Sequence, residues 1–98
     1  MMADQVRKAV VTAVGLDKKG IIANVSRVLF EKQCNIMEIA TTVLEGYFSM
    51  VVICDLSEMT EEFESLQKAL CALGEELGLD IRVKEDAYFS KLRQALEK

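Results

Sequence analysis

Residues 14–22 hold the spacing in this chain that is best suited to chemistry. An apolar segment ends there, and a segment with helical spacing begins, across a loop with Gly15 at one end and Gly20 at the other. Glycine lets backbone approach a bound group closely, and the free N–H groups at the start of the next helix form a site for a carboxylate or phosphate. The alternative is a tight strand-to-helix turn, in which Asp17 or a neighbour caps the helix. Both interpretations remain open from spacing alone.

The amino-acid composition argues against most catalytic and metal-binding sites. The chain has no histidine, which removes the commonest general base and metal ligand. Cys34, Cys54 and Cys71 are widely spaced and form no Cys-x-x-Cys pair, so neither a zinc site nor a disulfide framework is indicated. We therefore predict no catalytic residue, no metal and no cofactor, and reduced cysteines that act as small apolar side chains.

Length and charge define the broad class. The chain has 98 residues and a net charge of −4, which argues against nucleic acid or an anionic membrane as the partner. No apolar run approaches the roughly 18–20 residues that span a bilayer. The first five residues lack the pattern of a signal peptide, so a cytoplasmic protein is expected.

Hydrophobic periodicity in the first half predicts strand, helix, strand, strand. Residues 8–14 and 47–54 are apolar enough for buried strands, and residues 36–44 form a third, with a hairpin at Glu45-Gly46. After a polar turn at Cys34-Asn35, this third strand places three residues on one face: Ile39, Thr41 and Val43. From Gly20 a helix places an apolar stripe within about 120° of arc. That stripe comprises Ile21, Ile22, Val25, Val28 and Leu29.

The second half predicts helix, strand and a last helix. A polar linker at 55–60 is followed by glutamates 61, 62 and 64, which favour the first turn of a helix through its dipole. The apolar positions of this helix are Phe63, Leu66, Leu70, Leu73 and Leu77, and Gly78 ends it. Apolar and polar residues alternate over 79–84, which predicts a half-buried strand. Residues 87–97 are predicted to form an amphipathic helix.

The predicted fold is α+β, a ferredoxin-like βαββαβ sandwich. Its four-stranded antiparallel sheet carries two helices on one face, with a C-terminal helix added. We expect a single domain over residues 1–98, with a core of about 7–86 and the C-terminal helix at about 87–97. Two strands are apolar on both faces, so the open face needs a cover. A second copy of the chain supplies it in a homodimer; the alternative is a monomer with the C-terminal helix across the sheet.

The run from Val10 to Ile36 resembles the ACT domain family. That family opens with a strand, then Gly-x-Asp-x-Pro-Gly-Ile or Val, a helix, and a turn that ends in Asn-Ile. The matching residues here are Gly15, Asp17, Gly20, Ile21, Val25, Leu29, Asn35 and Ile36. The element order extends the resemblance over the whole chain, which looks like the small stand-alone ACT proteins of prokaryotes. Lys19 departs from the pattern, since many members have proline there.

The resemblance implies a regulatory module that binds an amino acid or related metabolite between paired domains and modulates protein association. The implied ligand-binding residues are Gly15, Leu16, Asp17, Gly20 and Ile21 on one side, and Asn35 and Ile36 on the other, often from the partner subunit. A target metabolic enzyme or regulator is the further partner that it implies. Serine-responsive members tend to have histidine at the position of Gly15 and asparagine at that of Asp17, so the class of ligand stays open.

Other functions share this element order. A domain that pairs with another protein and binds no small molecule is the main alternative. An acylphosphatase-like hydrolase needs an arginine in the first loop, which offers only Lys18 and Lys19. An RNA-binding module needs paired aromatics and a basic face, whereas Tyr47 and Phe48 point to opposite faces of a strand.

Overall fold

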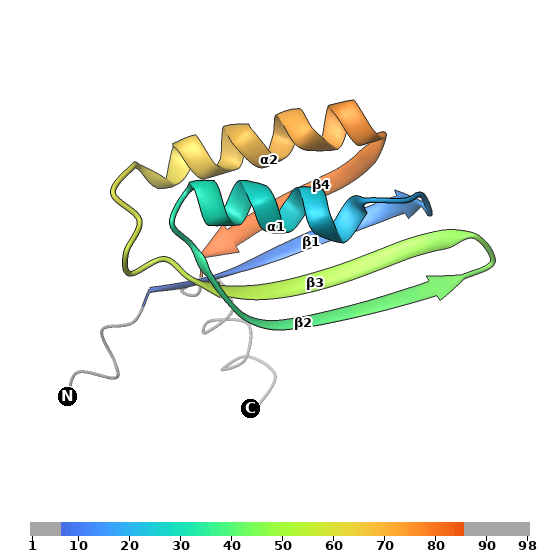
Figure 1. Ribbon diagram of the computed structural model, residues 1–98, viewed down its shortest axis with the longest axis horizontal. Helices are drawn as coiled ribbons and strands as arrows, with labels where there is room; N and C mark the ends of the chain where they lie inside the picture. The colour runs from blue at the N-terminus through green and yellow to red at the C-terminus, as the bar shows by residue number, and fades with distance from the viewer. Residues whose placement is uncertain (1–6, 86–98) are drawn as a thin grey trace, which may run out of the picture.

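The computed structural model describes residues 7–85, which form the βαββαβ fold that the sequence predicts (Figure 1). The elements are, in chain order, β1 (Lys8–Leu16), α1 (Ile21–Glu31), β2 (Asn35–Leu44), β3 (Tyr47–Asp55), α2 (Phe63–Leu77) and β4 (Leu79–Glu85). The helix predicted at 87–97 lies outside the described residues. No helix within 7–85 is long and apolar enough to cross a membrane.

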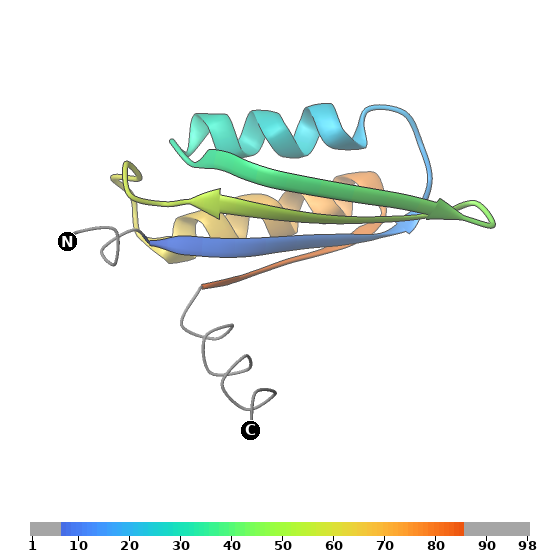
Figure 2. The same cartoon turned by 90° about the horizontal axis from the view of Figure 1, so that it is seen from below.

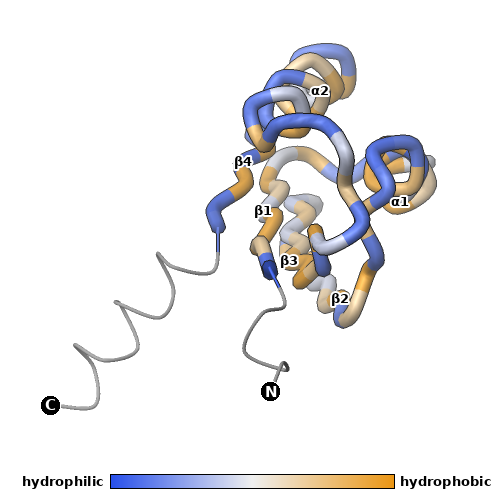
Figure 3. Tube along the Cα trace, turned by 90° about the vertical axis from the view of Figure 1, so that its left-hand side faces the viewer, coloured by the Kyte–Doolittle hydropathy of each residue, from blue (hydrophilic) through white to orange (hydrophobic). Residues whose placement is uncertain are grey.

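The four strands form one antiparallel sheet in the order β2-β3-β1-β4. Both helices cover the same face of the sheet, which leaves the other face free of described chain (Figure 2). Seen along the strands, α2 lies over β4 and α1 lies over the half of the sheet that contains β2 and β3 (Figure 3). Strands β2 and β4 are therefore the edges, and β1 is central.

The core forms where alternate strand residues meet the apolar stripes of the helices. Strand β1 buries its second, fourth and sixth residues, and β4 buries alternate residues from Leu79 onward, as period-two patterns require. From the helices, α1 contributes Ile21, Val25, Val28 and Leu29, and α2 contributes Leu66, Leu70 and Leu73. Helix α2 ends at Gly78, whose φ of 72° gives the left-handed cap that the sequence predicts.

Three local expectations were wrong. Ile22 is 44% exposed because it lies at the edge of the α1 stripe, beyond the reach of the sheet. The segment at 55–60 is not a polar linker: Asp55 ends β3, and Leu56 and Met59 are buried where the chain crosses the end of the core. Cys34, expected in a polar turn, is also buried, and Asn35 already belongs to β2.

Strand β2 is unusual in how much apolar surface it leaves exposed. Ile39, Thr41 and Val43 pair with Val52, Met50 and Phe48, so they share the helix side of the sheet, as predicted. Yet Ile39 is 45% and Val43 54% exposed, because α1 covers little of this edge strand. The sheet thus ends in a long strand that has apolar side chains and no backbone partner on its outer side within the described chain.

Candidate functional site

The loop between β1 and α1 is shorter than the sequence suggested. Strand β1 continues through Gly15 and Leu16, where they pair with Phe48 and Tyr47, so only residues 17–20 are loop. The N–H of Asp17 donates to the carbonyl of Gly46 at 2.9 Å, which holds the loop against the β2–β3 hairpin. The Nζ of Lys18 donates to the carbonyl of Leu77 and ties the loop to the end of α2.

Gly15 serves packing between strands. A Cβ at this position would lie 2.5 Å from Cδ2 of Leu79 and 3.2 Å from the carbonyl oxygen of Gly78, closer than real contacts allow. The pairing of Gly15 with Leu79 on β4 therefore accounts for the glycine. That Gly15 also lies against a bound group stays a prediction.

Gly20, by contrast, has the special backbone that the loop hypothesis requires. It is the N-cap of α1, with φ +86° in the left-handed region that glycine adopts without strain. Its carbonyl accepts hydrogen bonds from the backbone N–H of Asn24 at 2.9 Å and from Nδ2 of Asn24 at 2.7 Å. The first-turn N–H groups of residues 21–23 have no partner within the helix.

Asp17 does not cap α1. The cap position is occupied by Gly20, and no side chain makes a cap hydrogen bond there. The helix begins one turn later than a cap at Asp17 would require, because the left-handed Gly20 starts it. The exposed carboxylate of Asp17 is left at the mouth of the loop, where it can receive a cation.

A hollow of about 500 Å³ lies at this loop. Its lining joins a carboxylate, the start of a helix and apolar side chains: Asp17, Lys18, Gly20, Ile21, Ile22, Ala23 and Phe48. Three of the predicted residues (Asp17, Gly20 and Ile21) are thus brought together. Ile22, Ala23 and Phe48 were not predicted as site residues. Phe48 pairs with Gly15 across β1 and β3, so a predicted register for these two strands would have indicated it.

Asn35 and Ile36 lie elsewhere. They begin β2 and pair with Asp55 and Cys54, at the end of the sheet away from the hairpin (Figure 1). Asn35 and Leu44 are the two ends of this ten-residue strand and lie about 30 Å apart at the usual rise per residue. One copy of the chain does not gather the two halves of the predicted site.

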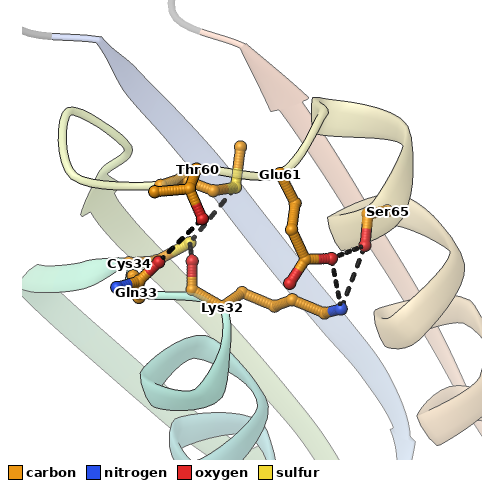
Figure 4. Close-up of polar contacts among 7 residues, drawn as sticks. Lys32, Gln33, Cys34, Thr60, Glu61 and Ser65 are labelled. Atoms are coloured by element: carbon orange, nitrogen blue, oxygen red, sulfur yellow. Dashed lines mark hydrogen bonds and ion pairs between the residues drawn. The ribbon is translucent and has the colours of Figure 1, made fainter.

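A second hollow, of about 610 Å³, lies between the end of α1 and the start of α2. Two of its charged groups pair with each other: Nζ of Lys32 donates to Oε1 of Glu61 and also to Oγ of Ser65, both at 2.9 Å (Figure 4). The Ser65 hydroxyl and Lys32 together lower the pKa of Glu61. This cluster joins the two helices, and we assign it a structural role.

Two buried thiols perturb each other beside this cluster. A hydrogen bond with Cys54 lowers the pKa of Cys34, whereas the same hydrogen bond and burial raise the pKa of Cys54. Among residues 7–85 there is no group of three or more His, Cys, Asp and Glu side chains that could hold a metal ion.

Comparison with known proteins decides the family. The family model described as "ACT domain" matches residues 7–84. The chain belongs to the ACT domain family. A UPF0237 protein of Listeria innocua is 37% identical over 87 residues, which cover 89% of this ACT domain chain and 98% of that protein. A UPF0237 protein of Methanopyrus kandleri is 46% identical over 82 residues, 83% and 91% of the two chains.

Solved structures agree. An ACT domain protein from Streptococcus pneumoniae superposes with a TM-score of 0.75 at 37% identity, over 85% of this chain and 93% of that one. The regulatory subunit of aspartate kinase from Thermus thermophilus shares the fold, with a TM-score of 0.61 at 18% identity, over 81% and 54%. Membership in the ACT family supports a small-molecule-sensing regulatory domain.

The corrected role of Asp17 predicts a small effect on the stability of this ACT domain. Asp17→Ala is expected to change the free energy of unfolding by less than about 0.5 kcal/mol, since no cap is lost. The matched control is Asp55→Ala. The Asp55 carboxylate accepts from the N–H of Ser57 at 2.8 Å and from its hydroxyl at 2.6 Å, so removing it should cost roughly 0.5–1 kcal/mol. Urea unfolding at neutral pH measures both.

Urea unfolding at acidic pH tests whether Asp55 stabilises the fold through its ionised carboxylate. The Ser57 hydrogen bonds lower the pKa of Asp55, so its contribution is present above the unfolded pKa and is lost as pH falls through the native value. The difference between Asp55→Ala and the natural chain should therefore disappear in acid. A loss of about 1 kcal/mol for Asp17→Ala would show instead that Asp17 caps the helix.

Proposed function

We propose that this ACT domain is a dimeric regulatory domain without catalytic activity, and that it binds an amino acid or related metabolite between two copies. The observation that carries the proposal is that the two predicted half-sites lie at opposite ends of β2, an edge strand whose outer side pairs with no strand among the described residues. The hollow at residues 17–23 is one half, and Asn35 and Ile36 are the other.

The chemistry of the hollow suits an amino acid. The first-turn N–H groups of α1 offer hydrogen bonds and positive potential to a carboxylate. The Asp17 carboxylate is available to an ammonium group, and charge-assisted hydrogen bonds of this kind are strong. Ile21 and Phe48 provide an apolar wall for a side chain. The side chain of Asn35 brings both a donor and an acceptor.

The edge of the sheet supports the dimer. Strand β2 presents a ten-residue edge with exposed Met37, Ile39, Val43 and Leu44, and a long apolar edge strand readily pairs with another chain. If two copies pair antiparallel through β2 about a two-fold axis at Ala40, the register shift between Ile36 and Glu38 brings Asn35 of one copy opposite Leu44 of the other. The loop is held to that same end of the sheet by the hydrogen bond from Asp17 to Gly46. Each dimer then has two complete sites.

Regulation follows from this placement. A ligand that bridges two copies binds the paired state better than the separate chains, so it shifts the equilibrium toward pairing. A target enzyme or regulator that binds only one of these states would therefore respond to the concentration of the ligand. Ligand sensing and protein association are thus coupled through one interface.

A thermal-shift screen of the twenty amino acids and common acidic metabolites tests the ligand. A ligand at 100 times its dissociation constant adds about 2.7 kcal/mol to the folded state, which should raise the melting temperature by roughly ten degrees or more. The shift should vanish in the Asp17→Ala, Asn35→Ala double variant. It should persist in Asp80→Ala, which removes an exposed carboxylate from the far edge strand β4.

No shift with any compound would contradict a sensor of these metabolites. The exposed β2 edge would then favour a domain that pairs with another protein and binds no small molecule. A shift that survives the double variant would place the ligand elsewhere on the domain.

Sedimentation equilibrium tests the dimer and its geometry. The natural chain should sediment at twice its 11.0 kDa. Ile39→Lys should dissociate the dimer, because two copies of the new charge meet near the axis and apolar burial is lost. The matched control is Asp80→Lys, which places the same side chain on β4.

A variant on the open face of the sheet tests face-to-face pairing as the alternative to edge pairing. Val51 lies on β3 in the centre of the sheet, 40% exposed. Dissociation by Val51→Lys but not by Ile39→Lys would show that the copies pair face to face and would overturn edge pairing. A monomeric natural chain would overturn both.

A further inference from the structure

The face of the sheet opposite both helices has an apolar centre that no part of the described chain covers (Figure 2). Two neighbouring rows of side chains cross this open face from β1 through β3 to β2. The first row is Val10, Ile53 and Glu38, and the second is Thr12, Val51 and Ala40. Val51 is 40% exposed although it lies on an inner strand. An apolar face of this kind is typical of a surface that packs against something else.

A hollow lies in these two rows. Its volume is about 420 Å³, and four residues of the rows line it together with Ile39. They are Glu38, Ala40, Val51 and Ile53. The hollow therefore lies over the β2 and β3 half of the open face.

Strand β4 ends beside the same rows, at the opposite edge of the sheet. Lys84 pairs with Val10 of the first row, and Glu85, the last residue of β4, pairs with Ala9. Residues 86–98 follow Glu85 and lie outside the described residues. This segment thus starts level with the apolar rows, on the strand next to them.

The sequence of the segment has the apolar stripe that such a face requires. At 100° per residue, the large apolar side chains of the helix predicted at 87–97 lie within about 100° of arc. They are Tyr88, Phe89, Leu92 and Leu96. Gln94 lies on the opposite side of the predicted helix. A short helix with one apolar stripe gains its stability by packing that stripe against another surface.

The dimensions of the two surfaces agree. A helix over 87–97 is about 16 Å long at the usual rise per residue. Three strand spacings separate β4 from β2, which is about 14 Å. A helix that begins beside β4 and crosses the strands therefore reaches β2. Glu38 is the one charged residue of β2, and Lys98, just beyond the predicted helix, has the opposite charge.

We propose that residues 87–97 form a helix that packs across the open face of the sheet of its own chain, from β4 to β2, with Leu92 over Val51 and Ile53. The sheet is then the middle one of three layers, with α1 and α2 on its other face. The cover occupies the face of β2 and leaves its edge free for a second copy. It therefore excludes face-to-face pairing and uses neither the loop hollow nor the β2 edge.

Reaction of an introduced thiol with N-ethylmaleimide tests this cover in the full chain. Every variant carries Cys71→Ser, which removes the exposed natural thiol, whereas Cys34 and Cys54 are buried. Val51→Cys places a thiol under the proposed helix, and Tyr47→Cys places one on the same face of the same strand, about 13 Å away. A thiol under a docked helix reacts only when the helix opens, so Val51→Cys should react at least about 10-fold more slowly than Tyr47→Cys.

A second substitution identifies the segment that protects the thiol. Leu92→Asp in the Val51→Cys chain places a charge under the helix and should raise the reaction rate about 10-fold. The matched control is Gln94→Asp, which adds the same charge on the opposite side of the helix and should leave the reaction slow. Leu92→Ala, which favours a helix but shortens the apolar side chain, should also accelerate the reaction.

Three results would overturn the proposal. Equal rates for Val51→Cys and Tyr47→Cys would show that the face is open. Protection of Val51→Cys that survives both substitutions of Leu92 would show that another surface covers it. Protection that is lost on dilution would show that a second copy supplies the cover, since a segment of the same chain acts independently of concentration. Cys34 and Cys54 should stay unreactive in each variant, which separates undocking of the helix from loss of the fold.

Discussion

Strand β2 is hydrogen-bonded to β3 on one side, while its other side is an unpaired edge of the described sheet. A strand edge of ten residues with exposed apolar side chains is prone to pair with another chain, because pairing removes those side chains from water. The helices do not relieve this, because α1 makes few contacts with β2 and α2 lies over β4. The proposed arrangement of the binding site depends on how this edge is satisfied. In the dimer that we propose, a second copy pairs with this edge and at the same time brings its Asn35 to the loop beside Gly46.

The sequence predicted the fold well because the elements have clear periods. The apolar runs of β1 and β3, the alternation in β4 and the stripes of α1 and α2 each indicate an element, and Gly78 marks a helix end through its backbone. The predictions were wrong where contacts between residues distant in sequence determine the role of a residue. Leu56 and Met59 look like parts of a polar linker, yet the end of the core needs their side chains. Gly15 looks like a loop glycine, whereas a contact with Leu79, distant in sequence, explains it.

The candidate site was predictable only in part, for the same reason. Asp17, Gly20 and Ile21 are neighbours in sequence, so their spacing reveals the loop. Phe48 joins them through the pairing of β1 with β3, which no local pattern shows. Likewise, the sulfurs of Cys34 and Met59 are 25 residues apart in sequence and 3.9 Å apart in space.

Subunit mixing tests most directly that the ligand site is shared between two copies. Homodimers of Asp17→Ala and of Asn35→Ala each lack one half of every site, so neither should bind the ligand found by screening. Mixing equal amounts under exchange should restore binding to about one quarter of the natural capacity, because half of the dimers are mixed and each holds one intact site. Absence of any recovery, with exchange verified by mass, would contradict a site built from two chains.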